Sequence, residues 1–204
     1  MIPVFFILVI IFTVWFRYES KKTGNTHDDA LDSYLEKEAK ANLTRKKDIS
    51  SLNYITIPEE CLKKHPGTDP EIDYYEDRLN KLSEKKIVNL TGLTNTELKL
   101  TYGAPNLTAL SSYDDNFIDL ARSVYKLGRL LLEAGFREDA KNMLSFGISF
   151  GTDVSANYTL LAGIYKEEND KGSVQELIDK AEALNSLTKA KLINDLYDIL
   201  DTLP

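Results

Sequence analysis

The chain has 204 residues, a hydrophobic fraction of 43% and a formal net charge of −7. This length accommodates one domain with attached segments. The acidic balance disfavours broad affinity for nucleic acid, which requires a basic face, so we expect no nucleic-acid partner. The single cysteine, Cys61, cannot form an internal disulfide, and the cysteine content therefore gives no sign of an oxidising compartment.

Residues 2–16 form an uncharged apolar run. As a helix this run reaches about 23 Å, against about 30 Å for the hydrocarbon core of a bilayer. Trp15 and Tyr18 suit the membrane interface, and Arg17 can extend toward it, which makes up part of the difference. We therefore predict a transmembrane anchor over residues 1–18 that contacts the lipid bilayer through residues 2–16. A cleavable signal peptide is the alternative, but its basic leading region and its small-residue cleavage site are both absent.

The charges that flank this run predict its orientation. Arg17, Lys21 and Lys22 follow the run, whereas only the terminal amine precedes it. Basic residues favour the cytosolic side, so the sequence predicts a single-pass protein of the cell membrane with a cytosolic C-terminal domain. The opposite topology, an extracytoplasmic domain that assists envelope assembly, is kept as an alternative.

Residues 19–68 are expected to form a juxtamembrane helix and a linker. Residues 19–26 are polar and indicate a hinge, residues 28–43 have helical periodicity, and residues 52–57 alternate like a short extended segment. Cys61 and His65 have the spacing of a thiolate–imidazole pair or of half a metal site. Pro66 disfavours a helix at His65, and no further ligand lies near in sequence, so we expect no metal, cofactor or catalysis there.

Two further helices are predicted before the most regular part of the chain. The first begins at Pro70 and carries an apolar stripe, and the second covers residues 93–102. The stripe consists of Ile72, Tyr75, Leu79 and Leu82. We expect both helices to pack on the helices that follow them, so that residues 69–204 form one helical domain.

Residues 121–188 repeat a pattern with a period of about 34 residues. Val124-x2-Leu127-Gly128-x2-Leu131 recurs as Tyr158-x2-Leu161-Ala162-x2-Tyr165. Small residues are expected where two helices cross, at Gly128, Ala140, Gly147, Ala162 and Ala181. Large apolar residues are expected to fill the space between helices, at Leu127, Leu131, Leu144, Leu161, Tyr165 and Ile178.

A pattern of this period and composition resembles the tetratricopeptide repeat (TPR). The resemblance implies helix–turn–helix units, here residues 121–154 and 155–188, that stack into a scaffold for binding other proteins. The amphipathic helix over residues 187–200 fits a C-terminal cap. The predicted fold class is therefore all-α, with an N-terminal transmembrane helix, a short TPR-like solenoid of helical hairpins and a capping helix.

The resemblance also implies a partner-binding face on the first helix of each unit. Its positions are Arg122, Tyr125, Arg129, Leu132 and Glu133, then Ala156, Thr159, Gly163, Lys166 and Glu167. Arginine and tyrosine suit an acidic peptide with an aromatic or apolar anchor, so the predicted contacts are Arg122, Tyr125, Arg129, Glu133 and Lys166. Packing on the preceding helix is the alternative role for each residue. The Lys/Asn clamp with which some TPR proteins hold a terminal carboxylate is not matched.

The sequence thus predicts a membrane-anchored adaptor that binds a protein or peptide partner and is not an enzyme. The alternative is an enzyme whose site lies in residues 49–113 and is regulated by the repeats. An enclosed polar pocket within residues 49–113 would favour this second hypothesis.

Overall fold

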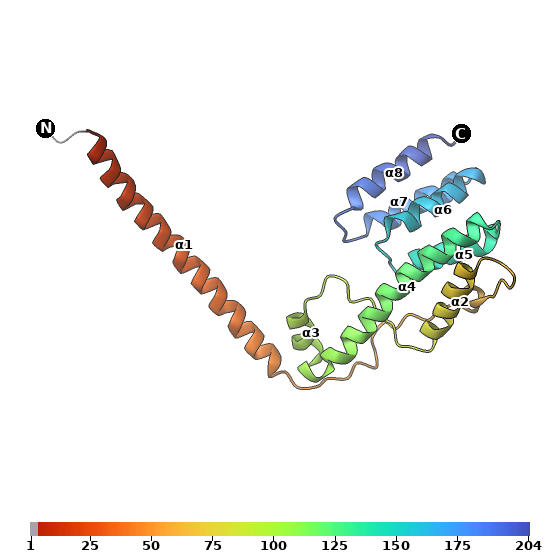
Figure 1. Cartoon of the computed structure of the whole chain (residues 1–204), viewed down its shortest axis with the longest axis horizontal. Helices are drawn as coiled ribbons and strands as arrows, with labels where there is room; N and C mark the ends of the chain where they lie inside the picture. Colours follow the sequence, from red (N-terminus) through yellow and green to blue (C-terminus); the bar gives the residue numbers. More distant parts are fainter. Residues whose placement is uncertain (1–3) are drawn as a thin grey trace. The chain divides into compact units, whose positions relative to one another are not determined.

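The computed structural model describes residues 4–204, except for the side chains of residues 21–29. The described part of the chain is helical, and its only extended pairing is an isolated antiparallel bridge between Tyr54 and Val88. The all-α fold is confirmed (Figure 1). In chain order the elements are α1 (Val4–Asn42), η1 (Glu59–Leu62), α2 (Pro70–Ser83), α3 (Asn95–Tyr102), η2 (Ala104–Asn106), α4 (Leu107–Glu133), α5 (Arg137–Ser149), α6 (Ser155–Glu167), α7 (Lys171–Glu182) and α8 (Lys189–Asp201).

The predicted transmembrane anchor is wrong. Within the described residues, no helix combines the length and the apolar character that are needed to cross a bilayer. The apolar part of α1 extends from Val4 to Phe16, about 20 Å of helix, and α1 then continues into Arg17 and a charged sequence. Residues 2 and 3 of the predicted run lie outside the described residues. The predicted localisation as a single-pass membrane protein is wrong for the same reason.

The chain divides into two compact units, and the first contains α1, α3 and η2. The predicted hinge over residues 19–26 is not a break, because α1 is continuous through it. The segment after α1 is fixed by Lys47, whose backbone N–H donates to the Tyr102 carbonyl at 3.1 Å. Gly103 has φ of +94°, and a Cβ there would lie 2.2 Å from the Arg45 carbonyl oxygen, so only glycine fits.

The second unit contains Ile49–Leu93 and Thr108–Pro204. In the first of its two apolar clusters, α2 packs with α4 and α5, as the apolar stripe of α2 predicts. Ile72, Leu79 and Leu82 of this stripe are buried. The expectation for α3 is wrong, because α3 belongs to the first unit, where it contacts α1. Glu38 of α1 holds it there through hydrogen bonds from Thr96 and Lys99.

The period of the repeat is present in the backbone as well as in the sequence. The helices α6 (Ser155–Glu167) and α8 (Lys189–Asp201) begin and end one repeat period apart. Gly135 and Asn169, which are separated by the same period, both have left-handed φ, of +87° and +56°. The next amide donates across each turn to an equivalent carbonyl, Phe136 to Leu131 at 2.8 Å and Asp170 to Tyr165 at 2.9 Å. Each hairpin therefore turns with the same hydrogen-bonded geometry.

The small residues of the pattern lie where helices cross closely. A Cβ at Gly128 of α4 would lie 2.8 Å from Cδ2 of Leu144 in α5. A Cβ at Gly147 of α5 would lie 3.0 Å from Cγ1 of Val124 in α4. The equivalent residues of the second hairpin, Ala162 and Ala181, are fully buried. These positions let the backbones of α4 and α5 approach.

Substituting glycine by leucine at two positions of the first helices tests this packing. Gly128→Leu should lower the free energy of unfolding by about 1–3 kcal/mol, because even its Cβ would lie 2.8 Å from Cδ2 of Leu144, which is fully buried. Gly163→Leu should leave it unchanged or raise it by up to about 1 kcal/mol, because a Cβ at Gly163 has no atom within 4 Å.

Urea denaturation of the two variants measures the difference between their free energies of unfolding. Both substitutions replace glycine by leucine in a helix, so the gain in helix propensity is the same and does not contribute to this difference. Arg129→Ala, one residue along from Gly128, should cost little because the Arg129 side chain is only half-buried. Equal destabilisation by Gly128→Leu and Gly163→Leu would contradict the assignment of the crossing.

Candidate functional site

The predicted partner-binding residues lie on α4 and α6. Arg122, Glu133 and Lys166 are exposed, whereas Tyr125 and Arg129 are half-buried. Arg129 donates from Nη1 to Oε1 of Glu133 at 2.8 Å, one helical turn along α4. The structure therefore brings Arg129 and Glu133 together as an ion pair, beside cationic and aromatic side chains of the same helix.

Of the other positions of the implied partner-binding face, some pack against neighbouring helices and others are exposed. Leu132 is partly buried and packs against both apolar clusters of the second unit. Glu167 is bound by Arg137 of α5, which also donates to the Ile164 carbonyl at 2.8 Å. Gly163 leaves open space, since a Cβ there would meet nothing within 4 Å. Leu132 thus has a structural role, whereas Gly163 borders open space.

The structure adds a third helix to this set. Because α8 repeats α6 one period later in the chain, Ile193 and Tyr197 occupy the positions of Thr159 and Gly163. Tyr197 is 41% exposed. Both residues follow from the sequence when the repeat period is extended by one more unit, to the helix predicted as a cap. We call Arg122, Tyr125, Arg129, Glu133, Gly163, Lys166 and Tyr197 the first-helix face.

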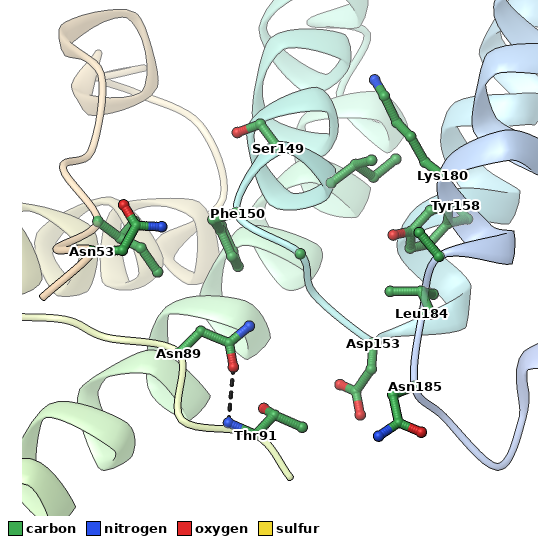
Figure 2. A pocket seen from close by; sticks show the side chains of 14 residues that line it. Asn53, Asn89, Thr91, Ser149, Phe150, Asp153, Tyr158, Lys180, Leu184 and Asn185 are labelled. Atoms are coloured by element: carbon green, nitrogen blue, oxygen red, sulfur yellow. Dashed lines mark hydrogen bonds between the residues drawn. The ribbon is translucent and has the colours of Figure 1, made fainter. Parts of the chain in front are cut away.

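A cavity of about 620 Å³ lies elsewhere in the second unit (Figure 2). Its walls come from the extended segments around the Tyr54–Val88 bridge, from the turn between α5 and α6, and from the end of α7. It is lined by Asn53, Ile55, Asn89, Thr91, Ile148, Ser149, Phe150, Gly151, Asp153, Tyr158, Lys180, Ala183, Leu184 and Asn185. Residues 49–113 thus supply only part of this pocket, and the repeat region supplies the rest.

The pocket contains polar side chains but no paired nucleophile and base among its described residues. Burial raises the pKa of Tyr158 to about 12, and the nearby charge of Asp153 adds to this effect. The Tyr158 hydroxyl donates to the Thr152 carbonyl at 3.3 Å and therefore stays protonated in a structural role. Ser149 donates to the Phe146 carbonyl at 2.7 Å.

Cys61 and His65 do not form the pair that their spacing permits. The short helix η1 ends at Leu62, so the two residues share no helix face. Burial raises the pKa of Cys61 to about 12, which keeps it a thiol. Within the described residues, no cluster of three or more His, Cys, Asp or Glu side chains has an arrangement suited to a metal ion.

His65 instead joins three segments of the second unit. Its Nδ1 lies 2.7 Å from Oε1 of Glu76 in α2, and its Nε2 lies 3.2 Å from Oδ2 of Asp139 in α5. The ring also packs on Phe136, with centroids 4.5 Å apart. Burial lowers the pKa of His65, but the hydrogen bonds to Glu76 and Asp139 outweigh it and raise the pKa above its usual value. The cluster therefore favours the protonated form of the imidazole.

Comparison with protein families, with curated proteins and with solved structures finds no match to this chain.

The His65 cluster predicts how stability depends on pH. Because the pKa of His65 is raised in the folded state, the folded state binds the proton more tightly than the unfolded state, whose imidazole has a pKa of about 6.5. The stabilisation is fully present below about pH 6.5 and is lost as the pH rises through the folded-state pKa.

Urea denaturation between pH 5.5 and 8.5 should therefore show the free energy of unfolding falling with pH, and His65→Gln should remove that fall. His27→Gln is the matched control, since His27 is the only other histidine. A slope that survives His65→Gln would show that another group is responsible.

Proposed function

We propose that this chain is a protein-interaction module that binds a protein or peptide partner through the first-helix face of a TPR-like helical stack. The observation that carries the proposal is the periodic repetition of helix bounds, left-handed turns and close crossings. Units of this kind present the same positions of successive first helices side by side, which suits recognition of an extended partner. The resemblance of the sequence pattern to TPR proteins points to the same role.

The side chains of the face indicate the chemistry of the partner. Arg122, Arg129 and Lys166 supply positive charge, although Glu133 neutralises part of it by pairing with Arg129. Tyr125 and Tyr197 supply aromatic surface, which together with arginine dominates the energetics of protein interfaces. The open space at Gly163 admits a partner side chain next to these residues. An acidic segment with an aromatic or apolar anchor fits this combination.

Site-specific photo-crosslinking tests the proposal. A benzoylphenylalanine at Tyr125 of the full-length chain should give a discrete adduct in cells, whereas the same probe at Tyr74, an exposed tyrosine of α2, should not. Gly163→Trp places a large side chain at a position where a Cβ meets no atom within 4 Å, so it should fill the open space and abolish the adduct at Tyr125.

Raising the salt concentration should weaken binding of the captured partner, because Arg122 and Lys166 are exposed and their charges are screened by ions. Equal adducts from Tyr125 and Tyr74, or an adduct that is indifferent to Gly163→Trp, would contradict the first-helix face as the binding surface.

A further inference from the structure

We infer that the cavity beside the α5–α6 turn is a second binding site, for a short extended peptide segment (Figure 2). This site lies on other residues than the first-helix face and does not depend on the function proposed for that face. Its volume of about 620 Å³ falls within the usual range for pockets that hold small ligands. Its walls combine side-chain amides with an apolar patch, and each part selects a different feature of a peptide.

The amides come from three separate segments. Asn53 and Asn89 flank the bridged residues Tyr54 and Val88, and Asn185 follows α7. Within the described part of the chain, the side-chain amides of Asn53 and Asn185 have no hydrogen-bond partner. Asn89 uses only its Oδ1, which accepts from the Thr91 backbone N–H at 3.0 Å. Donors and acceptors therefore remain available on three sides of the pocket.

A side-chain amide carries the same donor and acceptor as a peptide group. An asparagine can consequently form two hydrogen bonds with the N–H and C=O of an extended chain without regard to the side chains of that chain. The pocket wall is extended only around the Tyr54–Val88 bridge, where Asn53 and Ile55 line the cavity from one segment and Asn89 from the other, before the chain turns at Thr91. A peptide lying along this wall has its backbone within reach of the amides.

The apolar patch and the two charged side chains determine which types of residue the peptide needs and in which order along its sequence. Phe150 and Leu184 are half-buried and offer a surface for one apolar side chain. Lys180 and Asp153 lie on different sides of the pocket in Figure 2, with their side chains exposed. A peptide with an apolar residue in the middle, an acidic residue toward Lys180 and a basic residue toward Asp153 complements all four side chains.

The probe is a set of synthetic heptapeptides with blocked termini and a central Leu or Phe. One half carries lysine near the N-terminus and glutamate near the C-terminus, and the other half carries the reverse order. Fluorescence anisotropy with the full-length chain should show that one charge order binds more tightly, by at least about fivefold. The double variant Lys180→Glu with Asp153→Lys should reverse this preference.

The amides are tested by Asn53→Leu and Asn185→Leu, made separately. Each should weaken both charge orders by about fivefold or more, because each removes two hydrogen bonds from the peptide backbone. Asn142→Leu, at an exposed asparagine of α5 outside the pocket, should have no effect. Since Asn53 and Asn185 are exposed and lie on different segments, thermal melts should match those of the unsubstituted chain, and a folding defect cannot explain both losses.

Two results would overturn the inference. One is the absence of binding by either peptide set at millimolar concentration. The other is binding that is unchanged in both asparagine variants or in the charge-exchange variant. Gly163→Trp separates the two sites, because it should leave peptide binding at the pocket intact while it removes the crosslink at Tyr125. Failure of one site therefore leaves the other testable.

Discussion

The close approach of α4 and α5 at Gly128 and Gly147 is the contact on which the second unit depends. Without side chains at these positions, Leu144 and Val124 lie directly against the opposite backbone. Dispersion and burial are then gained over the whole length of the hairpin, because close packing requires that no atom hold the helices apart. The apolar cluster that α2 covers is built on this hairpin. A bulkier pair of residues would separate the helices and expose that cluster.

The second hairpin solves the same packing problem with slightly larger residues. Ala162 and Ala181 replace the two glycines and are fully buried. Asn169 adopts the left-handed conformation that Gly135 adopts in the first hairpin, which asparagine tolerates better than most residues. The helix α8 occupies the place of the first helix in a third unit, but it differs from α4 and α6 at one position. Asp195, which is partly exposed, stands where α4 and α6 have the buried Leu127 and Leu161.

The sequence could predict the parts of the fold that depend on local periodicity. The stripe of α2, the hairpins and the buried small residues all follow from spacing along one helix or from the period of the repeat. The prediction from local pattern is wrong at α1. Its apolar run is too short for a transmembrane anchor, and the helix continues into charged residues. Polar residues 19–26 do not interrupt α1 either, because polarity alone does not break a helix.

Contacts between segments that are distant in sequence could not be predicted from local periodicity. His65 meets Glu76 and Asp139 across 11 and 74 residues of sequence, and no periodic pattern relates these positions. The pocket likewise joins Asn53 and Asn89 to Asn185, which come together only once the bridge and the end of α7 are in place. The positions of the first-helix face could be predicted from the sequence because they recur with the period of the helices. The ion pair between Arg129 and Glu133 follows the four-residue spacing of a helix, so the sequence alone could indicate this contact.

A double-mutant cycle between α4 and α5 tests the helix crossing most directly. Gly128→Ala adds a methyl group against Leu144, and Leu144→Ala removes the side chain that this methyl group meets. If the crossing is as described, the double variant should be more stable than the sum of the single effects by at least about 1 kcal/mol, measured by urea denaturation. Effects that add to within about 0.5 kcal/mol would show that Gly128 and Leu144 are not in contact, and the account of the repeat would be wrong.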